Sequence, residues 1–291
     1  MTALPLTLLD DRFAASTLAL PTGARVIVRR CVGARVQRDG QPTFVLLHGI
    51  SSGAASWLHC ALALSEFGHV IAWDAPGYGE SSALQSATPT VDDYAARLDQ
   101  TLQALDIDSC VLVGHSLGAL MGAAYARTLG AGTVSNLVLI SPAGGYGTDE
   151  QTAARLRVRR QRRDDLQTLG IDGIAARTPD RLLSPNASDA ARDWVKWNTS
   201  RLNAGGYLQA VELLCGANLG RSAGLAMPVQ VYCGDADIVT PPDACERWAQ
   251  ILNATFAPIH AAGHASPVEQ PEAVARLIAS EGHPSRRPAH D

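Results

Sequence analysis

The stretch Cys110-Val-Leu-Val-Gly-His-Ser-Leu-Gly118 decides the fold. Its first four residues are apolar and predict a buried strand, and the small residues that follow Gly118 predict a helix. A serine between two glycines at such a turn is typical of a nucleophile elbow, which holds its central residue in a strained backbone conformation. The sequence therefore predicts that Ser116 projects above the carboxyl end of a strand. It would also lie at a helix N-terminus, whose partial positive charge stabilises negative charge on the serine.

Runs of Val, Ile and Leu recur on both sides of this elbow and predict further buried strands. The predicted strands are 43–47, 69–73, 110–113, 137–140, 229–232 and 255–259, and the predicted helices include 90–105, 243–252 and 271–279. Strands that alternate with helices predict an α/β protein with a mostly parallel, doubly wound sheet, whose site lies beyond the carboxyl ends of the strands. Alternating residues at 13–32 add an antiparallel hairpin at the sheet edge.

The strand rhythm stops between residues 143 and 226, where helix-forming residues with Gly and Pro punctuation take over. We interpret this segment as an inserted helical cap. The expected organisation is a core of residues 1–142 and 227–280, the cap 143–226 between them, and a polar, Pro-containing tail at 281–291.

A serine nucleophile needs a histidine base that a carboxylate orients, and in this strand order the acid and then the histidine follow the serine. Asp237 lies just after the strand 229–232, and His264 lies between the last strand and the last helix. Both positions are at the predicted catalytic edge. Asp235 is the competing acid, since either carboxylate could face the imidazole, and both could instead be turn residues.

The oxyanion of a tetrahedral intermediate needs two backbone N–H donors. One donor is expected from Leu117, the residue after the serine, and the other from Ile50, in the loop after the first parallel strand. We also expect four residues to line the substrate pocket: His48, Gly49, Trp57 and Val239.

These blocks together resemble the α/β-hydrolase family over nearly the whole chain. The resemblance rests on His48-Gly49, Asp74-Ala-Pro-Gly-Tyr-Gly-Glu-Ser81, the elbow, Asp237 and Gly263-His264. It implies a serine hydrolase that cleaves a carboxylic ester-like bond of a small molecule through an acyl-enzyme, with Asp74 as a structural residue. Relatives with Asp at the elbow cleave halides and epoxides, which Ser116 excludes.

Several functions remain open on the same residues. A hydrolase of carbon–carbon bonds in ring-fission products commonly has Asn before the serine and a Gly pair after it, whereas this chain has His115 and Ala119. Thioesterase, lactonase and amidase activities would use the same triad. A ligand receptor on this fold is the alternative that is not an enzyme.

Composition excludes other classes of function. The net charge of −4 and the aromatic content of 5% favour neither phosphate backbones nor base stacking, so nucleic acid is not an expected partner. No apolar run approaches the about 20 residues that a membrane-spanning helix needs, and the N-terminus lacks the basic segment of a signal peptide. Six scattered cysteines predict reduced, buried thiols in a cytoplasmic protein, and no metal or cofactor is expected.

Two features of the expected cap have alternative interpretations. Residues 155–163 contain six arginines, which could attract an acidic substrate or form a solvated helix face. Trp194 and Trp197 could roof an acyl pocket, but their spacing more often marks core packing. The oligomeric state is left open.

Overall fold

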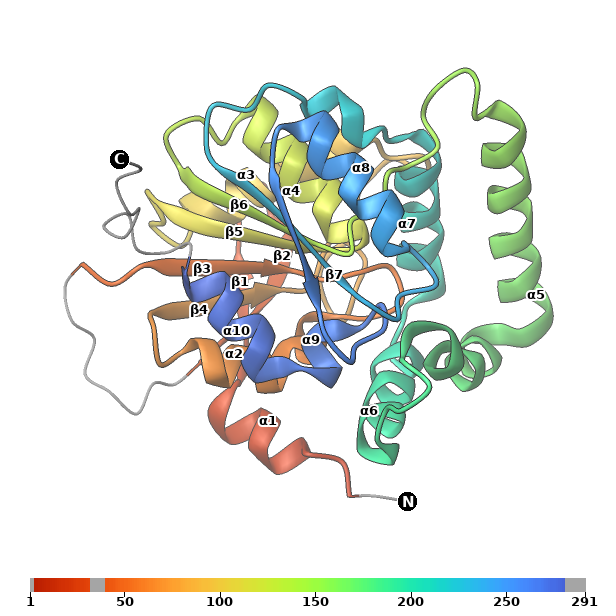
Figure 1. The fold of residues 1–291 in the computed structure, drawn as a ribbon, viewed down its shortest axis with the longest axis horizontal. Helices are drawn as coiled ribbons and strands as arrows, with labels where there is room; N and C mark the ends of the chain where they lie inside the picture. Colours follow the sequence, from red (N-terminus) through yellow and green to blue (C-terminus); the bar gives the residue numbers. More distant parts are fainter. Residues whose placement is uncertain (1–2, 32–39, 281–291) are drawn as a thin grey trace.

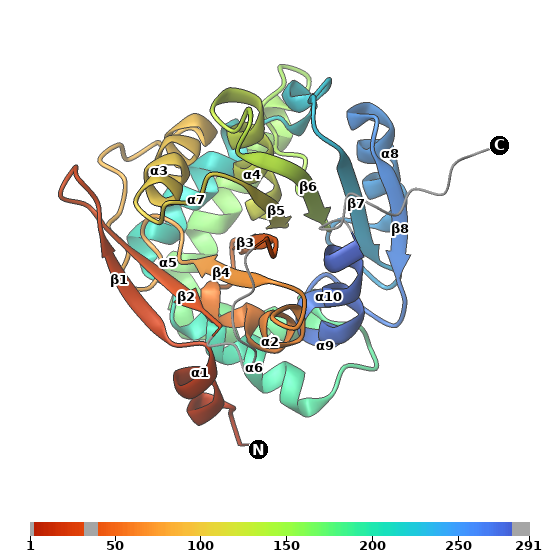
Figure 2. The same ribbon diagram turned by 90° about the vertical axis from the view of Figure 1, so that its left-hand side faces the viewer.

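The fold is known from a computed structural model, which describes residues 3–31 and 40–280. The described chain forms one sheet of eight strands, in the order β1-β2-β4-β3-β5-β6-β7-β8 (Figures 1 and 2). The strands are β1 (Ala15–Ala19), β2 (Arg25–Arg30), β3 (Thr43–Leu47), β4 (His69–Trp73), β5 (Cys110–His115), β6 (Val134–Ile140), β7 (Val229–Gly234) and β8 (Thr255–Ile259). The predicted tail 281–291 lies outside the described residues.

Strands β3 to β8 pair in parallel, whereas β1 and β2 form an antiparallel hairpin that joins the sheet at β4. The predictions of a mostly parallel sheet and of an edge hairpin are therefore confirmed. The carboxyl ends of the parallel strands meet at one edge, which is where loops can bring residues from distant parts of the chain together.

Helices cover both faces of the sheet (Figure 2). They are α1 (Leu6–Arg12), α2 (Leu58–Leu64), α3 (Val91–Gln103), α4 (Leu117–Thr128), α8 (Pro242–Leu252), α9 (Ser266–Glu269) and α10 (Pro271–Ser280), with a 3-10 turn η1 (Ala54–Trp57). Strand alternation divides the core: in β3, Val45 and Leu47 pack toward α3, α4 and α8, while Phe44 and Leu46 pack toward α2 and α10. A capping box between Thr90 and Asp93 begins α3.

The turn between β5 and α4 is tightly packed. A side chain at Gly114 would lie 2.5 Å from the carbonyl oxygen of Gly118, and one at Gly118 would clash with the backbone of Leu47 in β3. The two glycines thus let α4 approach the sheet closely. The strand β5 is two residues longer than predicted, because it stays in register with β6 as far as the pair His115 and Ile140.

The chain between β6 and β7 is helical where the sequence predicts helices. It contains α5 (Thr152–Leu182), α6 (Asp189–Ser200), α7 (Ala204–Gly216) and a 3-10 turn η2 (Leu219–Ser222). Figure 1 shows α5, α6 and α7 together on one side of the sheet. Gly170 has non-helical angles (φ 62°, ψ −178°) and divides α5 into two helices across a kink.

Candidate active site

Ser116 stands at the turn from β5 into α4 and has a strained backbone, with φ 53° and ψ −112°. An L-residue at positive φ costs about 1–3 kcal/mol, which the surrounding structure must offset. Hydrogen bonds fix the turn: Ser116 N–H donates to the carbonyl of Ile140 over 2.9 Å, and its carbonyl accepts from Ala119 and Ala143. Ser116 is 7% exposed and lines a cavity.

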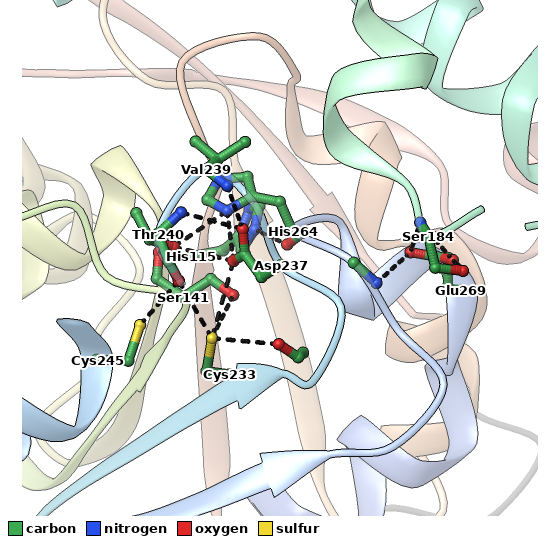
Figure 3. A network of polar contacts seen from close by, with 12 residues as sticks. His115, Ser141, Ser184, Cys233, Asp237, Val239, Thr240, Cys245, His264 and Glu269 are labelled. Atoms are coloured by element: carbon green, nitrogen blue, oxygen red, sulfur yellow. Dashed lines mark hydrogen bonds and ion pairs between the residues drawn. The ribbon is translucent and has the colours of Figure 1, made fainter. Parts of the chain in front are cut away.

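His264 and Asp237 form a buried pair at the same edge of the sheet (Figure 3). The ring Nδ1 of His264 donates to Asp237 Oδ2 over 2.8 Å, and both residues are 3% exposed. Because a carboxylate only accepts, the proton of this hydrogen bond sits on Nδ1, and Nε2 is the ring atom left to act as a base. His264 lines the same cavity as Ser116.

The Asp237 carboxylate is fully engaged. Its Oδ1 accepts from the N–H groups of Val239 at 2.7 Å and Thr240 at 3.0 Å, and the Thr240 hydroxyl lies 2.9 Å from its Oδ2. Burial acts to raise the pKa of Asp237, but the hydrogen bond and charge of His264 and the N–H of Thr240 outweigh burial and hold this pKa well below its usual range. Asp237 therefore stays ionised beside the imidazole.

The competing acid, Asp235, has a different neighbour. Its carboxylate lies 3.3 Å from the ring of His260, and the side chain of His260 is 83% exposed. Asp235 thus forms a surface contact away from His264. The geometry brings His264 together with Asp237 and not with Asp235.

The expected oxyanion donors, Ile50 and Leu117, both line the cavity. Within the residues that the structure describes, neither of their N–H groups donates a hydrogen bond. A Cβ added to Gly49 would lie 3.2 Å from the Cβ of Ser116, so the loop after β3 passes directly beside the serine. Gly49 is the residue type that permits this approach.

The cavity has a volume of about 560 Å³. Gly49, Trp57 and Val239 line it, as expected. His48 is not among the lining residues, contrary to the expectation. Its Nε2 accepts from Ala75 N–H over 3.0 Å and its Nδ1 donates to the Gly49 carbonyl, so the buried ring joins the loops after β3 and β4.

Three residues near the site were missed in the sequence. His115 lines the cavity, and its Nε2 donates to the backbone carbonyl of His264 over 2.8 Å. Burial, and then the neighbouring ring of His264, lowers the pKa of His115 to about 3, so it is neutral. Thr240 contacts both Asp237 and His264 Nδ1, and Ser141 gives its carbonyl to the Thr240 hydroxyl. The spacing of Asp237 and Thr240 is that of a side-chain turn and could have indicated this role.

A second carboxylate ties the helical segment to the loop of His264 (Figure 3). Glu269 in α9 accepts from the N–H and the hydroxyl of Ser184, which follows α5. Its other oxygen accepts from Gly263 N–H over 2.7 Å. Three segments thus meet at this one carboxylate, next to His264.

The arginine run and the tryptophan pair of the helical segment have separate places. Arg159 and Arg163 each form an ion pair with the buried Glu212 of α7, at 2.8 Å, whereas Arg162 lines the cavity. Trp194 and Trp197 stack at 4.7 Å between ring centres, and neither lines the cavity of Ser116. The core interpretation fits this tryptophan pair.

Two structural findings bear on location. Among the helices of residues 3–31 and 40–280, none is long and apolar enough to span a bilayer. All six cysteines fall in these ranges and are free thiols; five are buried and Cys31 is half-buried.

Comparison with known proteins agrees with this geometry. The model of the alpha/beta hydrolase family matches residues 44–277. A curated relative from Escherichia coli (strain SMS-3-5 / SECEC), named putative carbamate hydrolase RutD, is 29% identical over 252 residues, which cover 81% of this chain and 88% of the relative.

Two solved structures show the same fold. The enol-lactonase from Burkholderia xenovorans LB400 has a TM-score of 0.77 at 22% identity and covers 91% of this chain and 99% of its own. A thermophilic esterase from Thermogutta terrifontis has a TM-score of 0.74 at 21% identity, with 91% and 97% covered.

A mostly parallel sheet that carries a serine elbow, with a buried His–Asp pair at the same edge, defines the hydrolase class of α/β proteins. The chain belongs to the alpha/beta hydrolase family.

Proposed function

We propose that the protein is a serine hydrolase that cleaves a carboxylic ester-like bond of a small molecule through an acyl-enzyme. Ser116 is the nucleophile, His264 the base and Asp237 the residue that orients the base. The observation that carries this proposal is the buried hydrogen bond of 2.8 Å between His264 Nδ1 and Asp237, beside a strained serine in the same cavity.

In the first half of the reaction, Ser116 Oγ attacks the substrate carbonyl carbon while Nε2 of His264 takes the hydroxyl proton. The negative charge that develops on the carbonyl oxygen is stabilised by the N–H groups of Ile50 and Leu117. Collapse of this intermediate breaks the ester bond, and His264 returns the proton to the leaving alcohol. Asp237 stabilises the imidazolium throughout.

In the second half, a water molecule attacks the acyl-enzyme carbonyl after losing a proton to His264. The acid product leaves and the Ser116 hydroxyl is restored. In the first half His264 carries a proton from Ser116 to the leaving alcohol, and in the second half it carries one from water to Ser116.

Several types of bond contain a carbonyl that a serine can attack. The names of the relatives include a carbamate hydrolase, a lactonase and an esterase, and these bonds all have a carbonyl that a serine can attack. We propose esters as the leading substrates, with carbamates and lactones as the alternatives.

The experiment that tests this function measures hydrolysis of short and long nitrophenyl esters, a lactone and a carbamate. Ser116→Ala and His264→Ala should each lower kcat at least about 10⁴-fold on any substrate that the wild type cleaves. His260→Ala is the matched control, because its ring is exposed and contacts Asp235. A receptor would instead bind its ligand equally well in all three variants and turn nothing over.

The organisation and the location are proposals as well. We propose that residues 143–226 act as a cap over the core formed by 1–142 and 227–280, and that the protein works in the cytoplasm. The free cysteines are consistent with that compartment.

A further inference from the structure

The cavity above Ser116 contains two positively charged side chains. Arg162 and Arg181, both from α5, are among its lining residues. Of the lining residues that the structure describes, none is Asp or Glu. Much of the remaining wall is apolar, with Leu182, Val195, Leu214 and Trp248. Charged groups in such a cavity fix the orientation of a ligand.

Among the described residues, neither guanidinium group forms an ion pair with a carboxylate. Arg162 Nη1 donates to the hydroxyl of Tyr207 over 3.1 Å. Among the residues that the structure describes, the Arg181 side chain has no hydrogen-bond or ion-pair partner. Burial, and next the positive charge of Arg162, lowers the pKa of Arg181, and the carboxylate of Asp165 has a weaker effect on it than Arg162 has. Both cations also line the same cavity, so their charges act on one another.

The kink at Gly170 brings these arginines to one cavity. The two positions are 19 residues apart, and a straight helix with a rise of 1.5 Å per residue would separate them by about 28 Å. Gly170 has a φ of 62°, which breaks α5 between the two arginines. Both halves of the helix then supply a cation to the same space.

Other arginines of this run have carboxylate partners. Arg159 and Arg163 share Glu212 at 2.8 Å each. Glu212 is 6% exposed, so these two arginines neutralise a buried carboxylate. Arg162 lies between these two positions in sequence, yet it faces the cavity without a carboxylate.

We propose that Arg162 and Arg181 bind a carboxylate of the substrate, so that the preferred substrate is an ester-like compound whose acyl part carries a second, ionised carboxyl group. This deepens the proposed function and rests on it. A guanidinium group donates two parallel hydrogen bonds to a carboxylate, and the bound anion would relieve the repulsion between the two cations. The apolar wall would contact the carbon chain between the two carboxyl groups.

The test compares monomethyl esters of dicarboxylic acids with the corresponding dimethyl esters. Monomethyl succinate, glutarate and adipate scan the distance between the two carboxyl groups, and dimethyl glutarate differs from the monoester by the methyl group that removes the charge. For the best chain length, kcat/KM should favour the monoanion at least about tenfold, the strength expected of hydrogen bonds to a charged group. Proton release in a pH-stat measures both.

Variants locate the preference. Arg162→Gln and Arg181→Gln should each lower the ratio of kcat/KM for the monoanion to that for the diester by about tenfold, and Arg181→Lys should retain part of it. Arg160→Gln is the matched control on the same helix, because Arg160 is exposed and does not line the cavity. Its ratio should equal that of the wild type. Raised ionic strength should weaken the preference.

The outcomes separate the two proposals. An equal rate on monoester and diester, or a preference that survives in both arginine variants, overturns the carboxylate site while the serine hydrolase stands. A preference for an anion in the alcohol part, seen with the acetate ester of 4-hydroxybutanoate against butyl acetate, overturns the assignment to the acyl part. If the wild type hydrolyses none of these esters, nor the substrates of the first experiment, the proposed function itself is wrong.

A measurement on the wild type covers variants that fail to fold. Glutarate should inhibit the hydrolysis of a neutral ester competitively, with an inhibition constant at least about tenfold below that of uncharged glutaramide. Equal inhibition by the two compounds overturns the carboxylate site.

Discussion

At the scale of single residues, both carboxylate oxygens of Asp237 have hydrogen-bond partners, and these contacts fix the orientation of the catalytic base. One oxygen accepts from two backbone N–H groups and the other faces His264 and the Thr240 hydroxyl. The backbone bonds fix the direction of the carboxylate, so the ring that it orients is fixed as well. Burial acts to raise the pKa of Asp237, but the hydrogen bond and charge of His264, together with the N–H of Thr240, keep this pKa low.

Replacement of Asp237 by Asn tests this role. The amide keeps the size of the side chain but can present its NH₂ to His264, which favours the wrong tautomer of the ring. We expect kcat to fall by about 10⁴-fold with a smaller change in KM. Asp235→Asn is the control, and its kcat on the same ester should stay close to that of the wild type. A larger loss of kcat in Asp235→Asn than in Asp237→Asn would show that Asp237 is not the acid of the triad.

At the scale of elements, Glu269 joins three segments. Its carboxylate connects the residues after α5, the loop that carries His264, and α9. Gly263 and Ser184 are in close contact, because a Cβ added to Gly263 would lie 2.6 Å from the backbone nitrogen of Ser184. The position of His264 therefore depends on how the helical segment packs on the loop after β8.

Glu269→Gln should weaken this connection. The amide has one acceptor oxygen in place of two, so either Ser184 or Gly263 loses a partner. We expect the free energy of unfolding to fall by about 1–3 kcal/mol, together with a reduced kcat. Chemical denaturation monitored by circular dichroism measures the first quantity. Glu272→Gln on α10 serves as the control, because Glu272 is exposed, and equal effects of the two substitutions would contradict this role.

At the scale of the whole molecule, local sequence patterns predict the sheet and indicate which residues could meet at its catalytic edge. Apolar runs identify the parallel strands because such strands are buried on both faces. Ser116, Asp237 and His264 could be chosen because each lies in the turn or loop after a strand, and the carboxyl ends of those strands meet at one edge. Local patterns suffice for these positions.

Contacts between distant segments could not be predicted. The end of β5 is set by its pairing with β6, and the places of Arg162 and Arg181 depend on the kink at Gly170. His48 was expected in the pocket, but its ring bonds to Ala75, 27 residues away. No short stretch of sequence contains these partners together.

The stability of the whole protein should depend on pH through the buried histidine of the elbow. His115 has a pKa of about 3 when folded, whereas an unfolded histidine has a pKa of about 6.5. Between these values the unfolded chain binds more protons, so the free energy of unfolding falls as the pH is lowered from 6.5 toward 3.

The variant His115→Asn should reduce this slope, because Asn does not titrate and can still donate to the carbonyl of His264. Urea denaturation at pH 4.5, 5.5 and 6.5 measures the slope. Asp237, whose folded pKa is lowered, acts in the same direction at lower pH. An unchanged slope in the variant would show that His115 is not the group that titrates.

The central claim is that Ser116 is an activated nucleophile, and covalent labelling tests it most directly. A fluorophosphonate should add one phosphonyl group per chain, and peptide mass spectrometry should locate it on Ser116. The account predicts full labelling of the wild type, a much slower reaction in His264→Ala and none in Ser116→Ala. A wild type that stays unlabelled, or a label on another residue that persists in Ser116→Ala, would contradict the account.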